Sequence, residues 1–131
     1  MVVKGCHITL SGLRFHAYHG VLPQEQKTGG SFVVDLQVMG NLEKAVYSDE
    51  LTDTLNYGTI YELVKEEMMQ PSKLLEHVAG RIGQRIFDTF PTVEMVVVTV
   101  TKENPPMGAD LKGAGVTLVL SRDQQSCHCL K

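Results

Sequence analysis

Polar and apolar residues alternate from residue 8 to residue 17, in the pattern expected of a half-buried β-strand. The alternation changes parity at Ser11-Gly12, which predicts a β-bulge there, because a glycine inside a strand often marks one. A second alternating run occupies residues 31–40, so the two runs predict an antiparallel hairpin with a long connection. The predicted inward positions are Ile8, Leu10, Leu13, Phe15, Ala17, Phe32, Val34, Leu36 and Val38.

The period of the apolar positions then becomes helical. Residues 58–70 predict one helix, and Pro71-Ser72 ends it and offers Ser72 as the N-cap of the next. A second helix is predicted over residues 73–90, where Pro91 stops it. The apolar stripes are Ile60, Leu63, Val64 and Met68 on the first helix and Leu74, Leu75, Val78, Ile82 and Ile86 on the second.

Two further strands are predicted near the end of the chain. Residues 93–103 are rich in β-branched residues, and residues 113–122 alternate through Val116, Leu118 and Leu120. The resulting order, β-β-α-α-β-β, predicts an α+β fold in which an antiparallel sheet carries both helices on one face. We expect one domain over residues 1–122, followed by a mobile tail at 123–131.

One line of residues on the second predicted helix suggests association between chains. Glu76, Gly80, Gly83 and Phe87 share this line, and each helical glycine costs about 1 kcal/mol relative to alanine. A close approach of another backbone would explain the two glycines, either from a second copy or from the first helix. The two edges of a four-stranded sheet also need a cover or a partner, which favours a homo-oligomer.

Composition narrows the class of partner. The 131 residues are 43% hydrophobic and 21% charged, as in globular domains, and the formal net charge is −3. Such a charge argues against a nucleic-acid or membrane partner, and no segment has the pattern of a signal peptide or a membrane span. Three cysteines, an odd number, favour the reducing cytoplasm. The tail motif Cys127-His128-Cys129 lacks the spacing of a structural zinc site, so we expect no metal.

Four polar residues stand at element ends, where catalytic groups often lie. Glu25 follows the stretch "HAYHGVLPQ" in the first connection, and Tyr57 precedes the first predicted helix. Glu76 lies in the first turn of the second helix, and Lys102 ends a strand before "ENPP". Each also has an ordinary explanation as a solvated or capping residue. The residues alone do not choose between the two explanations.

The stretches "LRFHAYHGVLPQEQ", "DTLNYG", "LLEHVAGRI" and "VTKENPP", in this order and spacing, make the chain resemble the dihydroneopterin aldolases of folate biosynthesis. The resemblance covers residues 7 to 122. It implies a tunnelling fold, built on the β-β-α-α-β-β unit, that assembles into barrel-like rings. It further implies that two tetrameric rings stack into a homo-octamer, with each active site at an interface between subunits.

The resemblance also implies roles for individual residues. Lys102 takes the position of the catalytic general acid/base, and Glu25 that of the acid that anchors the substrate side chain. Tyr57 takes the position of a catalytic tyrosine that contacts the pterin from the neighbouring subunit. Leu75 and Glu76 take the positions that recognise the pterin, with the Glu76 carboxylate accepting from its amino and ring N–H groups.

The implied reaction is the retro-aldol cleavage of 7,8-dihydroneopterin into 6-hydroxymethyl-7,8-dihydropterin and glycolaldehyde. The C6=N5 imine of the substrate accepts the electrons, so neither a cofactor, a metal nor a lysine Schiff base is expected. Two alternatives stay open: a dihydroneopterin (or dihydroneopterin triphosphate) epimerase on the same fold, and a non-catalytic α+β module that binds a small ligand. GTP cyclohydrolase or pyruvoyl-tetrahydropterin synthase activity would need zinc ligands that we do not find in the sequence.

Overall fold

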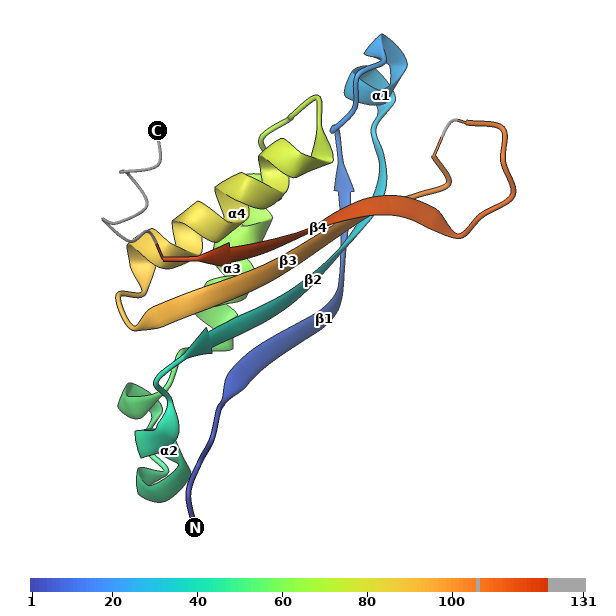
Figure 1. The fold of residues 1–131 in the computed structure, drawn as a ribbon. Helices are drawn as coiled ribbons and strands as arrows, with labels where there is room; N and C mark the ends of the chain where they lie inside the picture. The colour runs from blue at the N-terminus through green and yellow to red at the C-terminus, as the bar shows by residue number, and fades with distance from the viewer. Residues whose placement is uncertain (106, 123–131) are drawn as a thin grey trace, which may run out of the picture.

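A four-stranded antiparallel sheet in the order β1-β2-β3-β4 forms the base of the computed structural model, which describes residues 1–105 and 107–122. Its strands are β1 His7–Ala17, β2 Gly30–Gly40, β3 Val93–Glu103 and β4 Gly113–Ser121. Two helices pack on one face of this sheet, and the other face carries none of them (Figure 1). The predicted α+β fold is therefore confirmed.

The predicted bulge lies in β1. The register between β1 and β2 shifts between Leu10 and Leu13, and Gly12 has a φ of 68°, a conformation that glycine adopts at little cost. The Gly12 N–H donates a hydrogen bond of 2.7 Å to the Asp35 carboxylate on β2. The bulge keeps Phe15 and Ala17 on the buried side after the change of parity.

The two long helices cover different parts of the sheet. Helix α3, Tyr57–Met68, packs against β1, whereas α4, Leu75–Thr89, packs against β3 and β4. Both helices bury one stripe, as the helical period predicts. The buried residues are Ile60, Leu63, Val64 and Met68 on α3 and Val78, Ala79, Ile82, Gly83, Ile86 and Phe87 on α4.

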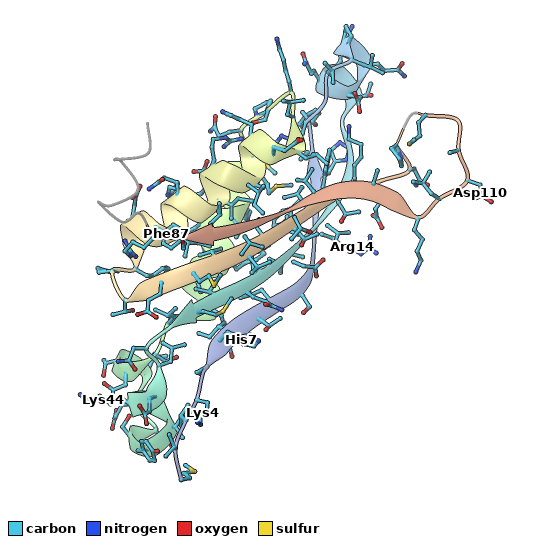
Figure 2. The ribbon with its side chains drawn as sticks, in the orientation of Figure 1. Lys4, His7, Arg14, Lys44, Phe87 and Asp110 are labelled. Carbon is cyan, nitrogen blue, oxygen red and sulfur yellow. The ribbon has the colours of Figure 1, made fainter. Side chains whose placement is uncertain are left out.

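Three short elements escape the sequence analysis: α1 Pro23–Thr28, α2 Glu43–Ser48 and the 3₁₀ turn η1 Leu51–Asp53. Each is a fully described segment that buries none of its own residues, so it leaves no apolar period in the sequence. Helix α1 lies at one end of the sheet and α2 at the other (Figure 1). Figure 2 shows the same two ends through His7 and Lys44 on one side and Asp110 on the other.

The prediction for the start of α4 is wrong. The helix begins at Leu75 with Leu74 as its N-cap, so Ser72 is not the cap and Leu74 is an exposed residue outside the buried stripe. The Ser72 hydroxyl bonds instead to the side chains of His77 and Arg81, in the first two turns of α4. The Ser72 hydroxyl thus bonds to side chains of the helix, and not to the backbone N–H groups at the helix N-terminus that a capping residue would satisfy.

The glycine line on α4 has a partial explanation within the chain. A Cβ on Gly83 would collide with the Cδ1 methyl group of Leu120 on β4, so the close neighbour of this glycine is a side chain of the strand and not the first helix. A Cβ on Gly80 would meet no heavy atom of the described chain within 4 Å. Contact between copies at Gly80 therefore stays a prediction. Within residues 1–105 and 107–122, no helix is long and apolar enough to cross a membrane.

Candidate active site

Lys102 lies near the end of β3, between Phe32 of β2 and Ala114 of β4. Its side chain is 17% exposed, and its Nζ lies 5.8 Å from the centroid of the Phe32 ring. Both strands that flank β3 thus fix the backbone of Lys102, and the aromatic face supports the ammonium group. The sheet register places this cation at the same end of the sheet as α1.

Glu25 lies in the first turn of α1 and faces Lys102 directly. One of its carboxylate oxygens, Oε2, accepts a hydrogen bond from Lys102 Nζ, while the other, Oε1, accepts one of 3.2 Å from the Leu22 N–H. The hydrogen bond from Lys102 is the main cause that lowers the pKa of Glu25, and burial of the carboxyl opposes it. The resting site therefore holds a carboxylate paired with an ammonium group.

A cavity of about 210 Å³ opens beside this ion pair. Its lining includes His19, Gln24, Glu25, Phe32 and Lys102. On another side of Lys102 lies a more open hollow, whose lining includes Leu75, Glu76, Pro105 and Gly115. Lys102 borders both spaces, so a ligand that fills both would contact the ion pair and the start of α4 at once.

The structure therefore brings four of the five predicted site residues to one end of the sheet. Glu25 and Lys102 are in direct contact, and Leu75 and Glu76 share the hollow that Lys102 borders. Glu76 is exposed in the isolated chain, in the first turn of α4. The Glu76 carboxylate is therefore a hydrogen-bond acceptor that solvent and small molecules can reach.

Tyr57 lies elsewhere. It is the first residue of α3, is 68% exposed, and lines a separate pocket with Ile8 and Leu51. Ile8 pairs with Val38 and Lys102 with Phe32, and these two rungs are about 20 Å apart at roughly 3.3 Å per residue along β2. One chain does not bring Tyr57 to Lys102.

His19 is a site residue to which the sequence analysis assigned no role. His19 is 1% exposed, and its ring packs edge-on against Phe32, with 5.2 Å between the ring centroids, in the wall of the cavity beside the Glu25–Lys102 pair. Burial lowers its pKa from 6.5 to about 4, assisted by the charges of Arg81 and Lys102 and opposed by the Met68 carbonyl. His19 is thus neutral near neutral pH. The available signal was its position, two residues beyond Ala17 in the inward phase of β1.

The described residues contain no group of three or more His, Cys, Asp or Glu side chains placed to hold a metal ion. The Cys127-His128-Cys129 motif lies outside the described residues.

The chain is similar in sequence and in fold to proteins of known family. The sequence model of the family described as "FolB: Dihydroneopterin aldolase" matches residues 8–119. A dihydroneopterin aldolase of Streptococcus pyogenes serotype M18 is 39% identical over 117 residues, which cover 88% of this chain and 98% of the relative. One from Staphylococcus epidermidis is 42% identical over 117 residues, covering 88% and 97%. The crystal structure of the Escherichia coli enzyme in complex with neopterin is 23% identical and superposes with a TM-score of 0.80, covering 88% of this chain and 99% of the other. That similarity concerns the fold.

Proposed function

This chain belongs to the dihydroneopterin aldolase family, and on that premise we propose that it cleaves 7,8-dihydroneopterin into 6-hydroxymethyl-7,8-dihydropterin and glycolaldehyde. The family resemblance of the four sequence motifs is confirmed, and the chain is an aldehyde-lyase of folate biosynthesis. A non-catalytic binding module is accordingly set aside. The observation that carries the mechanism is the contact between Glu25 and Lys102 beside a cavity.

The reaction moves two protons and one electron pair. The 2′-hydroxyl loses its proton, the C1′–C2′ bond breaks, and glycolaldehyde leaves as its C=O bond forms. The electron pair of the broken bond passes through C1′ into the C6=N5 imine, which gives an enamine. Protonation of C1′ then restores the imine and releases the hydroxymethyl product. Each proton step needs a positioned acid or base, which typically contributes roughly 10²–10⁴-fold to the rate.

We assign the proton transfer at C1′ to Lys102 and the anchoring of the substrate side chain to Glu25. The ammonium group of Lys102 carries the proton that C1′ needs, and Glu25 accepts hydrogen bonds from the substrate hydroxyls. In the resting chain the two groups satisfy one another, so neither charge is left unpaired at this partly buried position. A substrate hydroxyl that enters between them replaces part of this contact.

Leu75 and Glu76 form the proposed pterin site. The Glu76 carboxylate accepts from the amino and ring N–H groups of the pterin, a pair of charge-assisted hydrogen bonds. Its place in the hollow bordered by Lys102 supports an arrangement with the pterin head on one side of the lysine and the reacting side chain toward Glu25.

We propose that Tyr57 completes the site of a neighbouring subunit. The separation of about 20 Å between its end of the sheet and that of Lys102 supports this assignment, because no side chain spans it. A homo-octamer of two tetrameric rings provides such interfaces and covers the edges of β1 and β4. Family membership and the odd number of cysteines favour a cytoplasmic location.

Product analysis tests the proposed function. The wild type and Lys112→Ala, which removes an exposed lysine from the β3–β4 connection, are incubated with 7,8-dihydroneopterin. Chromatography then quantifies 6-hydroxymethyl-7,8-dihydropterin and the 2′-epimer, and glycolaldehyde is trapped and measured. Equimolar hydroxymethyl product and glycolaldehyde from both proteins are expected. Formation of the epimer alone would make the protein an epimerase, and absence of turnover would remove the proposed function.

A further inference from the structure

Ser72 is a buried polar residue that connects the two halves of the site. It lies in the turn between α3 and α4, and every polar group it carries has a partner. Its N–H donates to His19 Nδ1 at 3.0 Å, and its carbonyl accepts from the Gly20 N–H at 2.9 Å. Its hydroxyl bonds to His77 Nδ1 at 2.8 Å and accepts from Arg81 Nη2 at 2.9 Å.

The backbone of Ser72 leads to Glu25. The Gly20 N–H donates to the Ser72 carbonyl, and the Glu25 side chain packs so closely on Gly20 that an added Cβ would lie 2.5 Å from the Glu25 carboxyl carbon. The Gly20 carbonyl also accepts from Gln26 Nε2 at 2.8 Å, which holds α1 against the same residue. A displacement of Ser72 would therefore be transmitted to the carboxylate that faces Lys102.

The hydroxyl of Ser72 leads to Glu76. Helix α4 begins without a side-chain cap at Leu74, so the helix supplies no local hydroxyl that orients its first turn. The Ser72 hydroxyl, which lies outside the helix, orients the first turn instead, because it bonds to His77, the neighbour of Glu76. Arg81 reinforces the turn, because it also donates to the carbonyls of Glu67 and Gln70.

We propose that Ser72 is a positioning residue that sets the pterin-recognition residues Leu75 and Glu76 at the correct distance from the Glu25–Lys102 pair. This inference rests on the proposed function. Ser72 acts through His77 and Gly20 and does not itself contact the substrate. Its hydroxyl serves the binding half of the site, whereas its backbone groups serve the proton-transfer half.

Ser72→Ala separates these two halves, since it removes only the hydroxyl and keeps both backbone hydrogen bonds. Loss of the bond to His77 frees the first turn of α4, so KM for 7,8-dihydroneopterin and Kd for the hydroxymethyl product are expected to rise roughly three- to tenfold. We expect kcat to stay within about twofold, because Glu25 and Lys102 keep their contact. His77→Ala removes the same bond from the exposed side, and the double variant should show no larger KM than either single variant.

Arg85→Ala is the matched control. It removes two ion pairs that tie α4 to Glu66 and Glu67 of α3 but leaves the Ser72 hydroxyl with both of its partners. It should lower the unfolding midpoint without changing KM or Kd. The inference is overturned if Ser72→Ala and His77→Ala keep wild-type KM and Kd, or if Arg85→Ala raises both equally. A wild type that neither binds nor converts pterins would instead remove the proposed function itself, and the inference with it.

Discussion

The two ends of the sheet differ in whether their candidate site residues have partners within one chain. At the α1 end, Glu25 and Lys102 are 15% and 17% exposed and satisfy one another beside a cavity. At the α2 end, Tyr57 is largely exposed, and so are the apolar side chains of Tyr47 and Leu51 nearby. The first end holds a charged pair in place, whereas the second presents an aromatic group to whatever docks there.

This difference indicates how the work of the site is divided. Charges that transfer protons need fixed partners inside one folded unit, because an unpaired buried charge is costly. An aromatic contact needs only an exposed ring, which a neighbouring chain can supply at an interface. The α1 end should therefore control chemistry and ligand recognition, and the α2 end should control assembly of the complete site.

Removal of the lysine at the α1 end should have the largest effect. Lys102→Ala is expected to lower kcat by roughly 10²–10⁴-fold, because we assign the proton transfer at C1′ to this residue. Kd for the hydroxymethyl product should change little, since we assign recognition of the pterin to Leu75 and Glu76. Steady-state release of glycolaldehyde and calorimetric titration with the product measure the two quantities. An unchanged kcat would remove Lys102 from the proton transfer.

Mixed assemblies test whether the two ends belong to one shared site. Lys102→Ala and Tyr57→Ala chains should each be nearly inactive, and co-refolded mixtures should regain activity at about a quarter of the interfaces, where both intact residues meet. Activity per chain after co-refolding at equal concentrations gives the answer. A mixture no more active than its two components would show that Tyr57 does not belong to a shared site. The α2 end would then not contribute to the site of a neighbouring subunit.

Ligand recognition at the α1 end should depend on one carboxylate. Glu76→Ala is expected to raise Kd for the product and KM for the substrate by about tenfold or more, because a hydrogen bond to a charged group contributes about 1.5–3 kcal/mol. Glu62→Ala, which removes an exposed carboxylate from α3, is the control and should bind normally. Equal affinities for the two variants would show that the pterin does not use Glu76.

The α1 end should also make the fold sensitive to acid, through His19. Its pKa is lowered from 6.5 to about 4 in the folded chain, so its contribution is fully present above about pH 6.5 and is lost as the pH falls toward 4. The difference corresponds to about 3 kcal/mol of unfolding free energy. Urea titrations between pH 7.5 and 4.5 measure it, with His19→Asn as the non-titrating comparison. Parallel pH profiles for the two proteins would contradict the assignment.

Tests at the two ends thus separate three kinds of loss. A change confined to kcat points to the lysine, a change in affinity points to Glu76 or the Ser72 hydroxyl, and rescue by mixing points to Tyr57. Only the α2 end should allow one chain to replace what another has lost, because only there does the proposed contact cross between subunits.

The sequence alone determined the elements that carry a strong local period. Both long helices, β1, β2, β4 and the bulge at Gly12 follow from the spacing of apolar residues, β3 follows from its β-branched composition, and four motifs identified the family. Local patterns suffice for these features because each depends on which face of one element is buried. The short elements α1, α2 and η1 have no buried residues of their own and were missed for the same reason.

The tertiary structure alone decided how distant residues meet. Glu25 and Lys102 are 77 positions apart, and Ser72 bonds to His19 across 53 positions. The sheet register and the packing of α4 create these contacts, which no local period describes. The same register separates Tyr57 from Lys102 and places His19 against Phe32. The sequence showed which residue types the candidate site contains. The distances between them became known only from the fold, because contacts between remote segments depend on the whole core that holds those segments.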